Sequence, residues 1–238
     1  MTTIAIIQAR MGSSRLPGKV MKEICGKPMI EILLERLSLS KKLDEIVLAV
    51  SDQPENKLLL DYVSQLGFKV FQGSEENVLE RYFQAAAALK TRNIVRITAD
   101  CPLIDPFLVD LVVEDFENKN VDYLSNIYPR SFPKGLDTEI FSFQALEKAF
   151  NETSSPYNCE HVTPYIRESG EFKVGNFSNE KDWSNLRWTV DWLEDFQLIK
   201  KIFEFFTPNL IFSWQDVMIM REANPDVFRI NEHYIDSE

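Results

Sequence analysis

In the first half of the chain, short aliphatic runs alternate with amphipathic segments, and this order restricts the fold more than any other feature. Continuous aliphatic runs are typical of strands that are covered on both faces. We predict strands over residues 3–7, 46–50, 68–71 and 93–98. The segments between them predict helices over residues 55–65, 75–89 and 107–116. This β-α-β-α order predicts an α/β fold with a parallel sheet and right-handed crossovers.

The second half is less regular. Strands are expected over residues 121–124, 136–143, 172–177 and 186–190, and helices over residues 159–169 and 193–205. We find no internal repeat, low-complexity segment or Pro/Gly linker that would divide the chain. The sequence therefore predicts one domain over residues 1–238, with an inserted subdomain or dimer arm at about residues 126–185.

The loop after the first strand is basic, although the chain as a whole is acidic. The formal net charge is −11, yet the loop carries Arg10, Arg15 and Lys19 and no acid. Small residues stand between these cations, and glycine lets backbone amides approach phosphate oxygens closely. Open α/β sheets bind ligands where their strands end. The loop therefore predicts a phosphate site, and the plain alternative is a solvated basic loop.

The two common phosphate motifs do not match this loop. A Walker loop has four residues between its glycines and a Ser or Thr after the lysine. Here five residues separate Gly12 from Gly18, and Val20 follows Lys19. The dinucleotide motif Gly-x-Gly-x-x-Gly is also missing. The phosphate compound must therefore be recognised by a different arrangement.

The composition restricts which ligands the chain is expected to bind and in which cellular compartment we expect it. With a pI near 4.8 the chain lacks the broad basic surface that nucleic acids require, so a small anion is the expected ligand. The three cysteines are widely spaced and form no CxxC, which favours reduced thiols in the cytoplasm. No apolar run is long enough for a signal peptide or a membrane span.

Two aspartates follow predicted strands and should lie at the edge where the basic loop opens. Asp100 comes after the strand at 93–98, and Asp191 after the strand at 186–190. Magnesium prefers one or two carboxylates together with phosphate oxygens and water, so both are candidate metal ligands. Either could instead be a helix cap or a turn residue. Asp105 is expected to cap the helix that begins at Pro106.

Six segments, in the same order, resemble the motifs of the cytidylyltransferases. That family includes the CMP-sialic acid and CMP-Kdo synthetases, and the resemblance is greatest to its spore-coat polysaccharide biosynthesis type. The segments are residues 8–20, 73–82, 97–105, 135–141, 160–166 and 187–191. They span almost the whole chain, which makes the resemblance far more specific than one loop could.

The resemblance implies a three-layer α/β/α nucleotide-diphosphosugar transferase fold and a homodimer. It implies CTP as donor, magnesium (Mg2+) as cofactor, and Asp100 and Asp191 as the metal ligands. The expected reaction moves CMP to an acidic sugar or a small phosphorylated acceptor and releases pyrophosphate, in surface-polysaccharide precursor synthesis. The residues expected to act in catalysis are Arg10, Arg15, Lys19, Asp100 and Asp191.

The resemblance also suggests which residues contact each substrate. Those expected at the nucleotide are Gln8, Ala9, Arg10, Gly12, Ser13, Ser14, Arg15, Lys19, Gln72, Gly73, Ser74 and Asp100. Those expected at the acceptor are Asp137, Glu139, Glu160 and His161. From the residues alone, a lone histidine is more often structural than a ligand, and residues 136–143 could be a plain strand.

Two departures from the family pattern concern the acceptor. Sialic acid synthetases carry Lys and Asn where this chain has Ser14 and Val20, which argues against sialic acid. Three alternatives to a cytidylyltransferase stay open at this point. They are a nucleotidyltransferase for another nucleoside triphosphate, a glycosyltransferase that uses Asp100 with its metal, and a non-catalytic nucleotide-binding regulator.

Overall fold

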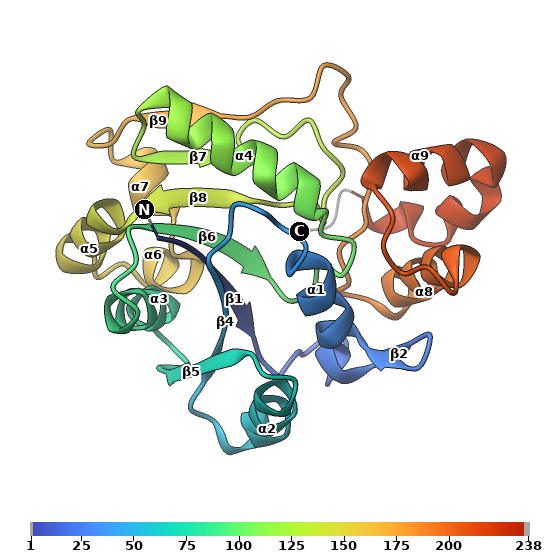
Figure 1. Ribbon diagram of the computed structural model, residues 1–238, viewed down its shortest axis with the longest axis horizontal. Coiled ribbons are helices and arrows are strands. Elements are labelled where there is room, and N and C mark those ends of the chain that lie inside the picture. Colours follow the sequence, from blue (N-terminus) through green and yellow to red (C-terminus); the bar gives the residue numbers. More distant parts are fainter. Residues whose placement is uncertain (1, 236–238) are drawn as a thin grey trace.

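A seven-stranded sheet in the order β5-β4-β1-β6-β8-β7-β9 forms the centre of the computed structural model, which describes residues 2–235 (Figure 1). The strands are β1 Thr3–Ala9, β4 Glu45–Ser51, β5 Lys69–Gly73, β6 Asn93–Thr98, β7 Tyr123–Ser125, β8 Glu139–Ser142 and β9 Val174–Asn176. β4, β1 and β6 run parallel, as do β4 and β5, whereas β8 is antiparallel to both of its neighbours. The predicted mostly parallel sheet is confirmed.

Helices cover both faces of this sheet, which gives the three layers expected of the fold (Figure 1). One layer packs on the larger core and holds α1 Met29–Leu37, α2 Lys57–Gln65, α4 Pro106–Lys119, α8 Leu193–Phe206 and α9 Trp214–Ala223. The other holds α3 Val78–Ala88, α5 Phe143–Glu152, α6 Pro156–His161 and α7 Pro164–Glu168. A short hairpin, β2 Glu23–Ile24 and β3 Lys27–Pro28, and four 3-10 turns complete the described chain. None of the helices within residues 2–235 is long and apolar enough to cross a membrane.

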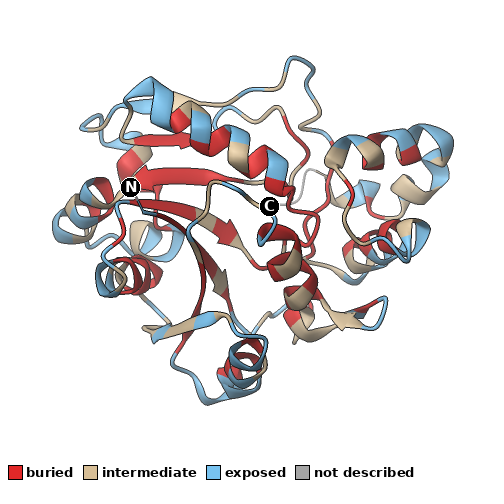
Figure 2. Cartoon of the chain, viewed as in Figure 1, coloured by how far each residue is buried: buried red, intermediate tan, exposed pale blue. Residues whose placement is uncertain are grey.

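The alternation of side chains along β1 explains how one strand serves both layers. Ile4 and Ile6 belong to the core under α3, while Ala5 and Ile7 belong to the opposite core. Successive side chains of a strand point to opposite faces, so Gln8 shares the face of Ile4 and Ile6. Figure 2 shows the resulting buried central strands in red.

The helix predicted over residues 75–89 begins three residues later than expected. α3 starts at Val78, and Asn77 is its N-cap, with its side-chain oxygen 2.9 Å from the amide of Glu80. The hydroxyl of Ser74 instead accepts from the amide of Asn77 at 3.0 Å. Ser74 is therefore a turn residue that precedes the helix. Asp105 does cap α4, since its Oδ1 accepts from the amides of Phe107 and Leu108.

The prediction of a strand over residues 186–190 is wrong, but the path of this segment explains how the chain reaches the end of β6. This segment crosses the strand ends as extended chain and makes one isolated bridge, between Lys134 and Arg187. Gly135 lies so close to it that a Cβ there would be 2.6 Å from the amide nitrogen of Thr189. Gly135 also has φ +111°, which other residues rarely adopt. The chain is thereby led to the end of β6, where Asp100 lies.

The predicted helix over 159–169 is two helices, α6 and α7, separated at Val162 and Thr163. The break lies at Val162, whose φ of +69° is far from helical backbone, and α7 then begins at Pro164. The range 126–185 contributes β8 and β9 to the same sheet that holds β1. Its role as a dimer arm stays a prediction.

A buried ionic cluster joins β6, β7, β8 and the start of α7. Glu139 pairs with Arg96 and accepts from the hydroxyls of Tyr123 at 2.6 Å and Thr163 at 2.7 Å. Burial alone would raise the pKa of Glu139, but the charge of Arg96 and these hydrogen bonds outweigh burial and hold the pKa below its ordinary value of 4.5. The cluster therefore depends on an ionised Glu139.

Replacing Glu139 by glutamine should lower the free energy of unfolding by about 3 kcal/mol or more, because it leaves the guanidinium of Arg96 buried without its counter-ion. Urea denaturation at pH 7 measures this loss. Glu204→Gln is the matched control, since in the described part of the chain Glu204 forms only an exposed pair with Lys200 at 3.8 Å. This substitution should change the free energy of unfolding by under about 0.5 kcal/mol.

The pH dependence provides a second measurement. A lowered folded-state pKa stabilises the protein above the unfolded-state pKa, and this contribution is lost as the pH falls through the folded value. The difference between the wild type and E139Q should thus be constant above about pH 5 and shrink in stronger acid. Equal stability losses in E139Q and E204Q would contradict the role of the cluster.

Candidate functional site

The basic loop lies at the carboxyl end of β1 and is held by a buried asparagine. The side-chain oxygen of Asn56 accepts from the amide of Met11 at 2.8 Å, and its Nδ2 donates to the hydroxyl of Ser51 at 2.6 Å. Sequence reasoning missed Asn56, since no local pattern relates it to the loop. It fixes the loop against the end of β4.

Three of the loop's amides are available to a ligand. The amide of Ser13 is used inside the loop, since it donates to the carbonyl of Met11 at 2.9 Å. Among residues 2–235, no hydrogen bond uses the backbone amides of Gly12, Ser14 or Arg15. Backbone amides that lack a partner in a glycine- and serine-containing loop suit phosphate oxygens. This arrangement supports the expected phosphate site and excludes the amide of Ser13 from it.

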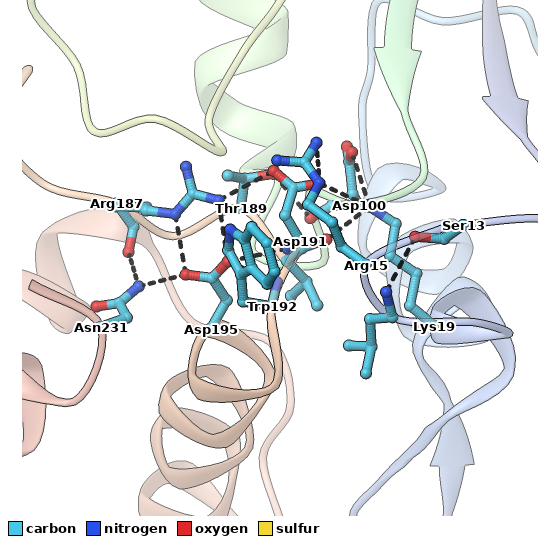
Figure 3. A network of polar contacts seen from close by, with 12 residues as sticks. Ser13, Arg15, Lys19, Asp100, Arg187, Thr189, Asp191, Trp192, Asp195 and Asn231 are labelled. Carbon is cyan, nitrogen blue, oxygen red and sulfur yellow. Dashed lines mark hydrogen bonds and ion pairs between the residues drawn. The ribbon is translucent and has the colours of Figure 1, made fainter. Parts of the chain in front are cut away.

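Lys19 lies between the two predicted metal aspartates, as Figure 3 shows. Its Nζ is 3.2 Å from Oδ2 of Asp100, 3.0 Å from Oδ1 of Asp191 and 2.7 Å from the carbonyl of Val190. The structure thus brings together a cation and two carboxylates from segments that are far apart in the sequence. Proximity of Asp100 and Asp191 was predicted from the strand ends, whereas the lysine between them was not.

Mutual charge stabilisation fixes the protonation states of this cluster. Burial alone would lower the pKa of Lys19, but Asp100 and Asp191 outweigh it and raise the pKa. Burial would likewise raise the pKa of Asp191, but the charges of Lys19 and Arg15 and a hydrogen bond from Arg187 bring the pKa below its ordinary value. Both shifts keep Lys19 and Asp191 charged at neutral pH.

The carboxylate pair fits a magnesium ion. The ammonium of Lys19 contacts both carboxylates, so a cation already occupies the position between them. A metal ion is another cation that can bind there. Within residues 2–235, no group of three or more His, Cys, Asp or Glu side chains could hold a metal. Magnesium is commonly bound by one or two carboxylates plus substrate phosphates and water, so two aspartates beside a phosphate loop suffice.

The loop carries two further cations, Arg15 and Arg10. Arg15 is 3.6 Å from Asp191, and its guanidinium lies 5.4 Å from the ring of Trp192. Arg10 has a mostly exposed side chain, with Nη1 3.4 Å from Oε1 of Glu75. Both cations are therefore open to an anionic ligand in the pocket.

These residues line an open pocket of about 460 Å³, which is within the usual range for small-molecule sites. The predicted residues in its wall are Gln8, Ala9, Arg10, Ser13, Ser14, Arg15, Lys19, Asp100, Glu160, His161 and Asp191. Glu160 and His161 come from the exposed end of α6 and face the loop across the pocket. The structure therefore brings together residues that were assigned separately to nucleotide, metal and acceptor.

Six predicted residues do not line this pocket: Gly12, Gln72, Gly73, Ser74, Asp137 and Glu139. Gln72 borders a second hollow beside α2. Asp137 is paired with both terminal nitrogens of Arg130, at 2.5 and 2.8 Å. Glu139 belongs to the buried cluster with Arg96. Contacts of Asp137 and Glu139 with the acceptor stay predictions and gain no support from the pocket wall.

Arg81 of α3 is the main pocket residue that sequence reasoning missed. It is buried, its Nη1 donates to the carbonyl of Ser74 at 2.7 Å, and burial lowers its pKa. Among residues 2–235, neither its Nε nor Oε1 of Gln8 has a hydrogen-bond partner. Arg81 lies inside the segment 73–82, so its presence in that motif could have marked it. Both atoms are buried, although the side chains that carry them line the pocket.

Comparison with known proteins agrees with this geometry. A family model described as cytidylyltransferase matches residues 4–221. The spore coat polysaccharide biosynthesis protein SpsF of Bacillus subtilis is 32% identical over 93% of this chain and 94% of its own length. The 3-deoxy-manno-octulosonate cytidylyltransferase of Chlamydia trachomatis is 27% identical over 71% of this chain and 69% of its own.

A solved structure is similar over nearly the full length. The cytidylyltransferase from Leptospira borgpetersenii serovar Hardjo-bovis superposes with a TM-score of 0.92 at 34% identity, covering 96% of this chain and 97% of that one. The family model alone covers well over half of the chain, and the SpsF relative exceeds 30% identity. This chain therefore belongs to the cytidylyltransferase family.

Proposed function

We propose that this protein transfers CMP from CTP to an acidic sugar or a small phosphorylated acceptor and releases pyrophosphate, as a step in surface-polysaccharide precursor synthesis. The observation that carries the proposal is the cluster of Lys19, Asp100 and Asp191 beside the unpaired loop amides. The names of the relatives support it, since one refers to spore coat polysaccharide and the other to an eight-carbon sugar acid.

In this mechanism an acceptor oxygen forms a bond to the α-phosphorus, and the bond from that phosphorus to the bridging oxygen of pyrophosphate breaks. The electron pair leaves with pyrophosphate, and a proton is lost only where the nucleophile is a hydroxyl. Such a transfer requires alignment and charge neutralisation more than covalent catalysis.

The loop and its cations would bind the triphosphate. The amides of Gly12 and Ser14 would bind the β- and γ-phosphates, and Arg10 and Arg15 would neutralise the leaving pyrophosphate. Lys19 would turn from the carboxylates to the α-phosphoryl group, where charge develops. Asp100 and Asp191 would hold magnesium, which supplies charge neutralisation at the phosphate oxygens when bound.

Cytosine as the base is part of the proposal, and membership of the cytidylyltransferase family supports it.

The acceptor would enter between the loop and α6. Glu160 and His161 are exposed in this wall, and His161 packs edge-on against Tyr157 at 4.7 Å. Ser14 and Val20 continue to argue against sialic acid. The homodimer stays a prediction.

A screen of acceptors with magnesium, read by pyrophosphate release, tests the function most directly. CTP should release pyrophosphate with an acidic sugar or phosphorylated acceptor, and UTP, GTP or dTTP should be poorer by about 10²-fold. Release from another triphosphate in preference to CTP would favour a nucleotidyltransferase for that base. Tight CTP binding without turnover across the panel would favour a regulator.

Lys19→Ala should lower kcat by about 10²-fold or more, because one preorganised stabiliser of the transition state is lost. Steady-state pyrophosphate release measures this effect. Lys22→Ala is the matched control, since Lys22 lies near the ring of Phe196 outside the pocket and should keep its activity. A Lys19→Ala enzyme within threefold of the wild type would remove this role from Lys19.

Asp100→Asn should weaken binding of Mn²⁺ to the CTP complex by about tenfold or more, because a charged ligand becomes neutral. Electron paramagnetic resonance of free Mn²⁺ measures this affinity without turnover. Asp61→Asn is the control, since Asp61 pairs with Lys57 on the exposed face of α2. Unchanged Mn²⁺ affinity in Asp100→Asn would exclude Asp100 from the metal site.

A further inference from the structure

We propose that the segment Asn231–Tyr234 is a positioning element of the catalytic centre, acting on Asp191 through one set of contacts and on Arg15 through another. The inference rests on the proposed function, in which Asp191 binds the metal and Arg15 binds phosphate. The segment lies beyond the residues that the family model matches, which end at 221. It follows the 3-10 turn Pro225–Arg229 and contains the turn Glu232–Tyr234, and Figure 3 shows Asn231 beside Arg187 and Asp195.

The first set of contacts centres on Asp195, at the start of α8. This carboxylate is fully buried and accepts from Nε and Nη2 of Arg187, both at 2.9 Å. Nδ2 of Asn231 donates to Oδ1 of Asp195 at 2.8 Å and to the carbonyl of Arg187 at 3.0 Å. Asn231 therefore fixes both partners of a buried ion pair.

This ion pair in turn orients Asp191. Nη2 of Arg187 donates to Oδ2 of Asp191 at 2.9 Å, and Oδ2 of Asp195 accepts from the backbone amide of Asp191 at 3.0 Å. Oδ1 of Asp191 is thereby left facing Lys19 at 3.0 Å and the pocket. Arg187 thus holds Oδ2 of Asp191, and Oδ1 remains available to a cation. This is how metal-binding side chains are usually oriented by their outer neighbours.

The second set of contacts is aromatic. The rings of Trp192 and Tyr234 are stacked, with centroids 5.0 Å apart and planes 7° from parallel. The guanidinium of Arg15 lies 5.4 Å from the same Trp192 ring. Trp192 is thus held between Tyr234 and the loop arginine that is expected to bind phosphate. Cations over an aromatic face are attracted by its electrons, so the ring helps to place Arg15.

The chemistry of the segment argues for more than packing. An apolar residue could fill the space beside Asp195. The amide of Asn231 does more, because it donates to the buried carboxylate of Asp195 and to the carbonyl of Arg187 and so sets their positions. A burying role alone predicts a loss of stability when the segment is altered. A positioning role predicts a loss of metal affinity and of phosphate binding in protein that stays folded.

The test compares two asparagines of the C-terminal part. Asn231→Ala should weaken Mn²⁺ binding to the CTP complex by about tenfold, as outer neighbours of metal ligands typically do, with the acceptor KM within twofold of the wild type. Asn224→Ala is the matched control, because among residues 2–235 Nδ2 of Asn224 donates only to the carbonyl of Met220 and does not reach the network. Thermal unfolding confirms that each variant is folded at the assay temperature.

Tyr234 provides a second test that does not disturb a buried residue. Tyr234→Leu removes the stacked ring and should raise the KM for CTP about threefold to fivefold, whereas Tyr234→Phe keeps the ring and should resemble the wild type. Equal KM values for all three proteins would remove the aromatic set of contacts from the inference.

Asp191→Asn separates this inference from the function on which it rests. If Asp191→Asn loses Mn²⁺ affinity while Asn231→Ala keeps it, Asp191 is a metal ligand and the positioning role of Asn231 is wrong. If Asp191→Asn binds Mn²⁺ as the wild type does, the metal role of Asp191 fails and the inference fails with it. Loss in both variants, with Asn224→Ala unchanged, supports the positioning role.

Discussion

The ammonium of Lys19 between the carboxylates of Asp100 and Asp191 is the interaction on which the catalytic centre depends. Two like charges this close repel strongly in a half-buried site, and a cation between them removes that cost. Three segments meet there: the loop after β1, the end of β6 and the extended chain that precedes α8. Their meeting forms the pocket, and the position of the Lys19 ammonium can then accept another cation.

This arrangement links the fold to the chemistry. The central strands are buried on both faces and rigid, so the residues at their ends are held where the layers leave an opening. Gly135 allows the segment 186–190 to pass closely over the sheet, and Asn56 fixes the loop from the other side. The reacting groups are therefore placed by backbone geometry, which suits a reaction that depends on alignment.

The sequence predicted the parts of this site that follow from local pattern. Aliphatic runs located the strands, and the residues after them located the loop and Asp100. The position of Asp191 near Asp100 was predicted correctly, but the reason was partly wrong. Its segment is not a strand and is held by hydrogen bonds to Lys134 and to the carbonyl of Asp100. Glu139 and Asp137 were assigned to the acceptor, yet partners that are distant in the sequence, Arg96 among them, hold Glu139 in the interior. Asn231 could not be predicted, since its contact with Asp195 spans 36 residues and has no local signature.

The central claim is that Lys19 serves as the counter-ion of the carboxylate pair until a metal takes that place. Mn²⁺ binding to the protein without nucleotide, compared between the wild type and Lys19→Met by electron paramagnetic resonance, tests this claim most directly. Removing the ammonium leaves two uncompensated carboxylates, so the variant should bind Mn²⁺ at least about tenfold more tightly than the wild type. Equal or weaker binding by the variant would contradict the account.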